Sequence, residues 1–288
     1  MKETLAFAVI GGSGLYQMQG LSDTREYEIE TPFGKPSSPI VVGTLEGKRI
    51  AFLARHGIGH FISPSEVNYR ANIYALKSLG ATQIVSISAC GSLREDYAPG
   101  HIIIPDQIFD NTKERARSFF GRGLVAHIGV ADPFCKELSE AVLAATKSSG
   151  ATVHYGGTLI TIEGPRFSTK AESHAYRSWG MSIIGMTASP EAFLAREAEI
   201  CYATMAHVTD YDVWHISAEP VTVEMVIQTL NKNTTLAQES LKALAQNLQP
   251  QPNCACQHAL ASALITNPAV VPADTYANLG LLVDKYLK

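Results

Sequence analysis

Apolar positions follow two periods along most of the 288-residue chain. Short runs of branched and aromatic residues predict buried strands, as at Leu5 to Ile10, which runs into Gly11-Gly12. Apolar residues recurring every three or four positions predict helices, as at Glu66 to Leu79, with Ser65 as N-cap and Gly80 as the stop. Further strands are predicted at 40–43, 49–54, 83–89, 101–104, 153–162, 183–186 and 201–208, and further helices at 134–148, 170–179, 191–199, 221–248 and 274–287. This alternation predicts an α/β fold with a central mixed β-sheet flanked by helices.

The chain shows no internal repeat and no low-complexity linker. The stretch Gln249 to Asn253 is polar and contains proline, but apolar helical sequence follows it. We therefore predict one domain over residues 1–288, closed by a helical segment from about residue 250.

Composition narrows the class of protein. Charged residues make up 17% and hydrophobic residues 46% of the chain, against a usual charged share of about 25%. These values exclude disorder and predict a large core with further surface covered in an oligomer. The net charge of −4 argues against a nucleic-acid polymer as partner, because phosphate neutralisation needs a clustered basic face. No apolar run approaches the roughly 20 residues that span a bilayer, so we expect no membrane partner.

The cysteines and the first residues bear on the compartment. Five cysteines, an odd number in a long chain, favour a reducing cytosol over a disulfide framework. The apolar stretch 5–10 is short and runs straight into a glycine turn, which is unlike a signal peptide. We expect a cytoplasmic protein.

Small, polar or ionisable residues follow the predicted strands, and ligands of open α/β sheets bind in such loops beyond the carboxyl ends of strands. The loops are Gly-Gly-Ser-Gly (11–14), Arg-His-Gly (55–57), Ala-Cys-Gly-Ser (89–92), Glu-Gly-Pro-Arg-Phe (163–167), Gly-Met-Thr (185–187) and Thr-Asp-Tyr-Asp (209–212). Their coincidence is the main functional signal in the sequence.

The glycine-rich turn at 11–14 is suited to an anion, because backbone N–H groups and the Ser13 hydroxyl can surround it. It is not a dinucleotide fingerprint, since Gln17 stands where a glycine is required, and no Gly-Lys-Ser/Thr follows. Leu15 stands where a nucleophile elbow needs glycine. A strand-exit turn without a ligand remains the alternative.

Arg55 and His56 follow a predicted strand. An arginine fork binds an oxyanion through paired N–H donors, and the histidine can add a donor. The alternative is a surface arginine beside a packed histidine. His56 and His60 are four residues apart, but Gly57 and Gly59 oppose a helix and the acidic partner of a zinc motif is missing, so we expect no metal.

Asp210 and Asp212 follow the strand 201–208. Residues two apart in extended chain point to the same side, and two carboxyls facing one pocket repel, which raises the pKa of one. A protonated carboxyl would donate to a base nitrogen and an ionised one would accept from an exocyclic amine. A solvated acidic turn is the alternative.

Two cysteine motifs are weaker signals. Cys90-Gly91-Ser92 begins like a papain-type motif, but Leu93 and Arg94 replace the expected residues, so a buried structural thiol is favoured. Cys254 and Cys256 would suit a metal or redox pair, but no matching second pair exists, and ordinary thiols are favoured.

Together the motifs resemble the trimeric purine nucleoside phosphorylase family, in particular its branch that cleaves methylthioadenosine. They are GGSGLY (11–16), TPFGKPS (31–37), LARHG (53–57), NYRANIYALKSLG (68–80), ACGSLRE (89–95), TIEGPRFS (161–168), GMTASPEAFLAREAEICYA (185–203) and TDYDVW (209–214). They cover residues 11 to about 230 in order, whereas the segment from about 250 diverges.

The resemblance implies a single nucleoside phosphorylase domain and a pentosyltransferase that converts 5'-methylthioadenosine and phosphate into adenine and 5-methylthioribose 1-phosphate, in purine and methionine salvage. It implies no cofactor, with inorganic phosphate as co-substrate, and a cytoplasmic homotrimer. Phosphorolysis of 6-oxopurine nucleosides, such as inosine, and nucleoside binding without turnover are the alternatives. Asp210 favours adenine, because a carboxylate accepts from an amino group.

The resemblance also implies roles for individual residues. Phosphate would be held by Ser13, Arg55, His56, Ser88, Ala89 and Thr187. The nucleoside would contact Phe167, Met186, Asp210 and Asp212, the last two being catalytic. The 5'-pocket and its specificity would involve Ser168, Val223, Val226, Ile227 and His127 from a neighbouring subunit.

Two departures from the family pattern limit the transfer. Gly185 stands where the family often carries a polar residue, so one hydrogen bond to the sugar would be absent. The part from Cys254 onward, which in the family contributes to the 5'-pocket, differs from many relatives. The Cys-x-Cys pair forms a disulfide in some members.

Overall fold

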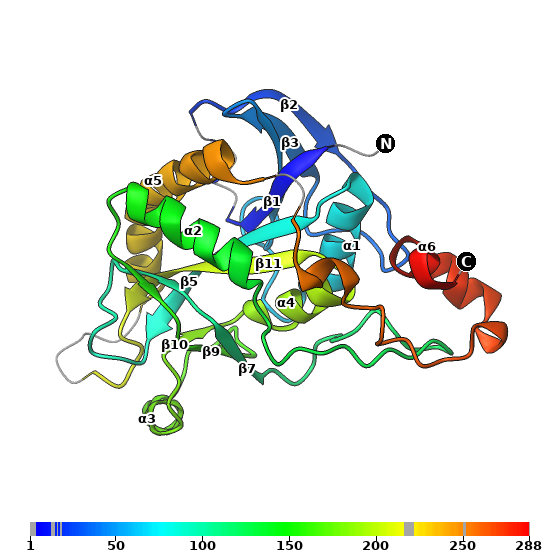
Figure 1. The fold of residues 1–288 in the computed structure, drawn as a ribbon. Helices are drawn as coiled ribbons and strands as arrows, with labels where there is room; N and C mark the ends of the chain where they lie inside the picture. The colour runs from blue at the N-terminus through cyan, green and yellow to red at the C-terminus, as the bar shows by residue number, and fades with distance from the viewer. Residues whose placement is uncertain are drawn as a thin grey trace.

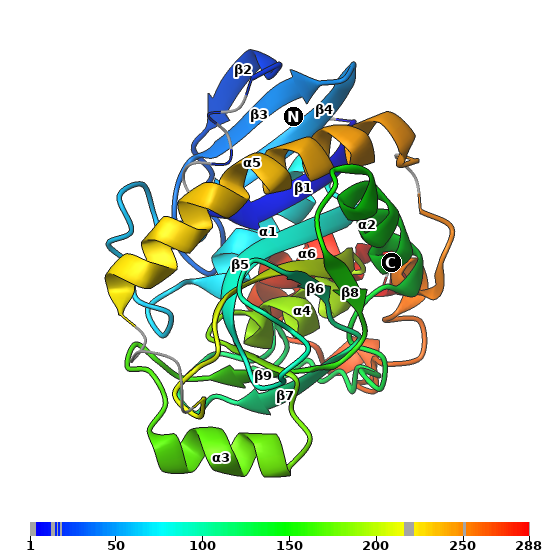
Figure 2. The ribbon, with the colours of Figure 1, turned by 90° about the vertical axis from the view of Figure 1, so that its left-hand side faces the viewer.

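A computed structural model describes residues 4–12, 15, 17, 19–215, 222–249 and 252–287, without the side chains of 225–233. One eleven-stranded mixed sheet forms its centre, with helices on both faces (Figures 1 and 2). The predicted α/β fold is confirmed.

The sheet has a main path and a branch. The main path runs in the order β2 (Ser22–Tyr27), β3 (Ile40–Leu45), β4 (Lys48–Ala54), β1 (Leu5–Gly11), β5 (Gln83–Ser92), β10 (Ile183–Gly185), β9 (Thr158–Ile162) and β7 (Gln107–Asn111). The branch leads from β5 through β11 (Cys201–Asp210) and β6 (Ile102–Ile104) to β8 (Val153–Tyr155). β4, β1, β5 and β11 are parallel, whereas β10 is antiparallel to β5. The carboxyl ends of β4, β1, β5 and β11 therefore lie at one edge of the sheet, where β5 pairs with β10.

The helices form two layers around this sheet. They are α1 (Tyr69–Leu79), α2 (Lys136–Ser148), α3 (Lys170–Ser178), α4 (Ala188–Glu197), α5 (Val223–Asn247) and α6 (Ala273–Leu287), with short 3-10 turns η1 (Ala255–His258) and η2 (Pro268–Val270). Side chains of α2 and α5 pack on one face of the sheet, and those of α1, α4 and α6 on the other. β11 is buried at every position, as expected of a strand covered on both faces.

Several predicted boundaries shift for local reasons. The first helix begins at Tyr69, because the Asn68 side chain, not Ser65, caps it by accepting from the backbone N–H of Ala71. Gly80 ends it in the left-handed conformation, as predicted. The run 153–162 is two strands, since Gly156 and Gly157 both adopt positive φ and interrupt it.

The patterns missed β2 and β7. β2 is exposed at nearly every position, so it carries no alternation of apolar and polar residues. Both strands end the main path, where one side of the strand has no partner. Among the described residues, none of the helices is both long and apolar enough to cross a membrane.

Candidate active site

A cavity of about 710 Å³ lies where the carboxyl ends of the strands converge. Loops after β4, β9, β10 and β11 and the end of β5 line it, and α5 closes one side. The predicted site residues that line it are Arg55, His56, Ser88, Ala89, Phe167, Ser168, Met186, Thr187, Asp210, Asp212 and Val223. The described residues of the strand-end motifs therefore line one cavity.

The remaining predicted residues do not line this cavity within the described part of the chain. Ser13 lies outside the described residues, and so do the side chains of Val226 and Ile227, which belong to α5. His127 is exposed in a loop whose backbone N–H donates to the Ala263 carbonyl. A contribution from His127 to a neighbouring subunit remains a prediction.

Glu191 of α4 forms an ion pair with Arg55. Its Nε and Nη2 donate to the two carboxylate oxygens of Glu191 at 2.7 and 2.8 Å, and both side chains are almost fully buried. Nη2 also donates to the Ser86 hydroxyl at 2.7 Å. The prediction that Arg55 offers a two-point fork to an anion is therefore wrong, because Glu191 occupies that fork.

One N–H of Arg55 has no acceptor among the described residues. Nη1 bonds to the Ile87 carbonyl at 3.2 Å, and a guanidinium Nη carries two hydrogens. Within the described residues this leaves one N–H for an anion. Arg55 thus supplies a fixed positive charge and a single donor at the floor of the cavity.

His56 is a neutral acceptor, not the expected donor. Its Nδ1 lies 2.9 Å from the Ile62 carbonyl, which can only accept, so Nδ1 carries the proton. Burial, helped by the nearby charge of Arg55, lowers the pKa of His56 to about 4. Nε2 therefore presents a lone pair near neutral pH.

The other predicted anion contacts lie close to this pair. Ser88 and Ala89 are half-buried near the end of β5. Thr187 is the N-cap of α4, and no helix N–H uses its side chain. Ser189, two residues further along, has non-helical backbone, so a regular helix does not follow Thr187 directly.

The acidic pair lies at the end of β11. Asp210 is the last residue of β11, after a register shift between Val208 and Asp210, and Asp212 adopts a positive φ of 51°. The backbone is therefore not extended through the pair, and the predicted reason for their shared direction is wrong. A turn brings both carboxyls to the cavity.

Burial, more than mutual repulsion, raises the pKa of Asp210 and of Asp212. The Asp210 oxygens accept from the Thr209 hydroxyl at 2.6 Å and from the Asp212 backbone N–H at 2.7 Å, which opposes part of that rise. Oδ2 of Asp212 is buried without a partner among the described residues. The carboxyl pair therefore favours carrying a proton at higher pH than free aspartates do.

Gly91 makes room for this pair. A methyl group at Gly91 would lie 3.0 Å from the Asp210 Oδ1 and 3.3 Å from the Cβ of Asp212. A side chain at this position would force the carboxyls away from the end of β5. Neighbouring Cys90 is buried, and burial raises the pKa of its thiol, consistent with the structural role predicted for it.

Arg115 supports the site without lining it. Its guanidinium donates to the backbone carbonyls of Met186 at 2.6 Å, Ser189 at 2.7 Å and Glu163 at 2.7 Å. These bonds fix the loops after β9 and β10 relative to each other. Sequence reasoning missed Arg115, because its partners lie 48 to 74 residues away and no local pattern marks it.

His207 is a second buried group that the sequence did not reveal. It lies within β11, is 1% exposed and lines the cavity. Both ring nitrogens lack a partner in the described part of the chain. Burial lowers its pKa to about 4, so the ring is neutral near pH 7.

Comparison with known proteins identifies the class. The chain belongs to the phosphorylase superfamily, whose family model matches residues 6–246. It is 53% identical over 280 residues to the S-methyl-5'-thioadenosine phosphorylase of Geobacter sulfurreducens, covering 97% of this chain and 98% of the relative. The corresponding protein of Gloeobacter violaceus is 54% identical over 285 residues, with coverage of 96% and 95%. The chain's relatives are thus S-methyl-5'-thioadenosine phosphorylases, and the predicted resemblance is confirmed.

Solved structures agree with this assignment. A methylthioadenosine phosphorylase from an Antarctic soil metagenomic library superposes with a TM-score of 0.93 at 48% identity, covering 97% of this chain and 99% of that chain. Methylthioadenosine phosphorylase from Schistosoma mansoni in complex with adenine superposes with a TM-score of 0.84 at 35% identity, covering 89% and 98%.

Proposed function

We propose that this chain cleaves 5'-methylthioadenosine with inorganic phosphate, giving adenine and 5-methylthioribose 1-phosphate. The observation that carries the proposal is one cavity with a cationic, hydrogen-bonding floor at Arg55 and a buried carboxyl pair at Asp210 and Asp212. Relatives of about 50% identity over nearly the whole chain carry the corresponding name.

Phosphate binds at the floor. Arg55 supplies a fixed positive charge and one N–H donor, and Thr187 and the end of β5 supply further donors. We assign a further donor to Ser13, which lies outside the described residues. Neutral His56 accepts from a phosphate hydroxyl through Nε2. No protein nucleophile is required, since a phosphate oxygen attacks C1' of the sugar while the bond from C1' to the purine N9 breaks.

The purine leaves with the electron pair of that bond. A protonated carboxyl donates its proton to N7, which neutralises the charge developing on the base. We assign this proton to Asp210, and acceptance from the 6-amino group to Asp212. Burial at the end of β11, which raises the pKa of both groups, supports the assignment.

The sugar lies between the phosphate at Arg55 and the purine at Asp210 and Asp212. Met186 faces the ribose hydroxyls, and Phe167, which is 39% exposed, packs against base and sugar. Ser168 and Val223 line the cavity toward α5, where Val226 and Ile227 would complete an apolar pocket for the methylthio group. An apolar pocket suits this uncharged substituent.

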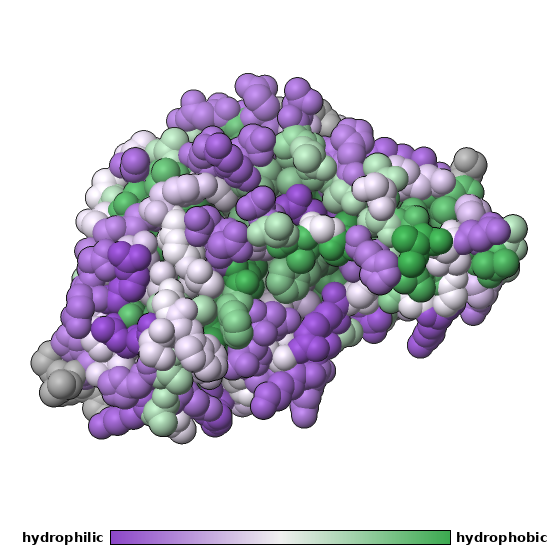
Figure 3. All heavy atoms as spheres, turned by 60° about the horizontal axis from the view of Figure 1, so that its bottom comes forward, coloured by the Kyte–Doolittle hydropathy of each residue, from purple (hydrophilic) through white to green (hydrophobic). Residues whose placement is uncertain are grey.

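We further propose a cytoplasmic homotrimer that serves purine and methionine salvage, in which His127 completes the 5'-pocket of a neighbour. Val125, two residues from His127, and Ile265, whose backbone N–H donates to the Val125 carbonyl, are exposed apolar side chains. Apolar surface also gathers around α6, on the right of Figure 3. Such surface favours burial in an interface.

The assembly proposal has its own test. In sedimentation, the protein should behave as a trimer, and His127→Ala should raise the KM for nucleoside with little change in the KM for phosphate. A fully active monomer, or an unchanged nucleoside KM, would contradict the shared site.

The activity is tested by incubating the protein with 5'-methylthioadenosine, with and without phosphate. Adenine should appear only with phosphate, in equal amount to 5-methylthioribose 1-phosphate. Binding without adenine release would favour a non-catalytic nucleoside-binding protein. Faster cleavage of inosine or methylthioinosine would favour a 6-oxopurine phosphorylase.

A further inference from the structure

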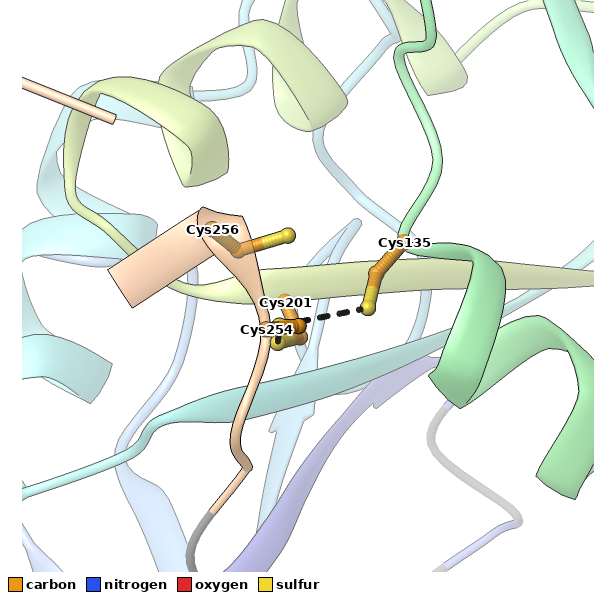
Figure 4. Close-up of side chains that lie close together, drawn as sticks. All are labelled: Cys135, Cys201, Cys254 and Cys256. Carbon is orange, nitrogen blue, oxygen red and sulfur yellow. Dashed lines mark hydrogen bonds between the residues drawn. The ribbon is translucent and has the colours of Figure 1, made fainter. Parts of the chain in front are cut away.

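Four of the five cysteines meet at the end of the sheet opposite the cavity (Figure 4). Cys201 is the first residue of β11, and Cys135 is the N-cap of α2. Cys254 and Cys256 come from the C-terminal segment that enters η1. All four Sγ atoms lie within 4.8 Å of one another. The cysteine side chains of β11, α2 and the C-terminal segment therefore meet at one place.

The distances fit a single tetrahedral ion. A zinc ion with four thiolates at about 2.3 Å places the sulfur atoms about 3.8 Å apart. The Sγ of Cys254 lies 3.8 Å from that of Cys135 and 3.2 Å from that of Cys201. Two disulfides would require only that the sulfur atoms lie close together in pairs. One shared ion requires that all four sulfur atoms lie close to one another.

We propose that Cys135, Cys201, Cys254 and Cys256 bind one zinc ion as a structural site. Four thiolates select a soft divalent ion, and a closed set of four protein ligands is characteristic of structural zinc. On binding, four sulfur–zinc bonds replace the S–H bonds, and the released protons pass to solvent.

The surroundings suit thiolates. Cys135 stands at the N-terminus of α2, where the helix dipole stabilises negative charge. The Gln257 amide lies 3.9 Å from the Cys201 Sγ and can donate to it. The Cys135 thiol donates a hydrogen bond to the Glu137 carboxylate at 3.4 Å, and zinc binding would replace this contact with a sulfur–zinc bond. Cys254 is partly exposed and offers an entry path, while the other three are buried.

The site would fasten the C-terminal segment to the sheet. From Cys256 the chain continues to Ala263 and Ile265, which bond to the backbone of His127 and Val125. The ion would therefore stabilise the loop that carries His127, without contact to the cavity. From the sequence, Cys254 and Cys256 suit a metal pair but have no matching second pair, because Cys135 and Cys201 belong to distant elements.

Zinc binding can be measured directly. Wild-type protein, reduced and stripped with a chelator, is titrated with Zn²⁺ against a chromophoric competitor, and with Co²⁺ to record thiolate-to-metal charge transfer. We expect one ion per chain, a tetrahedral cobalt–thiolate spectrum and a higher Tm with zinc. Cys254→Ser should weaken affinity roughly 100-fold or more, whereas Cys254→His, which restores a zinc ligand, should bind one ion.

Cys90→Ser is the matched control, because Cys90 is a buried cysteine outside the cluster. It should bind zinc as the wild type does. The proposal is overturned if the reduced wild type binds no stoichiometric zinc, or if Cys254→Ser binds it equally well. It is also overturned if the native protein carries disulfides among these cysteines and takes up no zinc after their reduction.

Discussion

Glu191 and Arg55 form a buried two-point ion pair that joins α4 to the loop after β4, with oxygen–nitrogen distances of 2.7 and 2.8 Å. Glu191 also accepts from the Tyr202 hydroxyl of β11 at 2.8 Å. The pair therefore fixes the guanidinium at the wall of the cavity before any ligand arrives. Preorganised charge of this kind favours binding of the proposed phosphate, because no rearrangement is needed.

Removing the charge of Glu191 while keeping its shape should destabilise the fold. We expect Glu191→Gln to lower the free energy of unfolding by about 3–5 kcal/mol, because Arg55 is left as a buried charge without its partner. Urea unfolding measures the change. The control is Glu30→Gln, since Glu30 pairs with Lys35 on the surface and its loss should cost no more than about 1 kcal/mol. Equal effects of the two variants would contradict the role of Glu191.

The polar and ionisable residues that follow the strands could be located from the sequence, because each motif is a short continuous segment. Arg55, Thr187 and Asp210 each follow an apolar run directly, so locating the strand also located the residue. Glu191 and Arg115 could not be predicted in this way. Glu191 meets Arg55 across 136 residues, and Cys135 meets Cys254 across 119. Such contacts depend on how the layers pack, and one sequence carries no periodic signal for them.

The same limit applies to the orientation of the residues that line the cavity. Arg55 lines it, but the direction of its fork depends on Glu191. His56 lines it, but its proton position depends on the Ile62 carbonyl. Asp212 lines it, but a residue with φ of 51° is not part of an extended strand. Residue type and position were predictable, whereas hydrogen-bond direction required the folded environment.

His207 should make stability pH-dependent. Burial holds the folded pKa of His207 at about 4, below the ordinary histidine value of 6.5, so the unfolded chain binds a proton first as pH falls. This contribution to stability is complete above pH 6.5 and is lost as pH falls toward 4. Between pH 7.5 and 5.0 it should cost about 2 kcal/mol.

His207→Met should remove this cost, so the variant should lose about 2 kcal/mol less than the wild type over that pH range. Urea unfolding of both proteins at pH 7.5 and 5.0 gives the difference between their changes in unfolding free energy. His174 is exposed, and His174→Gln should follow the wild type. An identical pH dependence in His207→Met and the wild type would show that burial does not lower the pKa of His207.

His56 should distinguish phosphate from sulfate. Because Nε2 is an acceptor, it needs a ligand hydroxyl, which phosphate carries near neutral pH and sulfate lacks. We expect His56→Phe to raise the KM for phosphate about tenfold, near 1.4 kcal/mol. Inhibition by sulfate should change much less. Steady-state kinetics with sulfate as competitor give both values, and equal weakening of the two anions would indicate that His56 donates or acts only through packing.

Asp210 should determine both the rate and the preferred base. Asp210→Asn removes the titratable proton for N7 at almost constant volume and introduces an amide that can donate. Both oxygens of Asp210 accept from neighbours, the Thr209 hydroxyl and the Asp212 N–H, so the amide also loses part of this network. We expect cleavage of methylthioadenosine to fall at least tenfold, about 1.4 kcal/mol or more in the barrier.

Cleavage of inosine or methylthioinosine by Asp210→Asn should fall less, or rise, because an amide N–H can donate to a 6-oxo group. Asp212→Asn is the matched variant, since it alters the same pair but leaves the carboxyl assigned to N7. It should affect the KM for adenine nucleosides more than kcat. The measurement is kcat and KM on four nucleosides: methylthioadenosine, adenosine, inosine and methylthioinosine. If Asp210→Asn keeps the parental rate and the parental preference for adenine nucleosides, the proton for the leaving purine comes from another group, and Asp212 with its unpartnered Oδ2 becomes the donor to test.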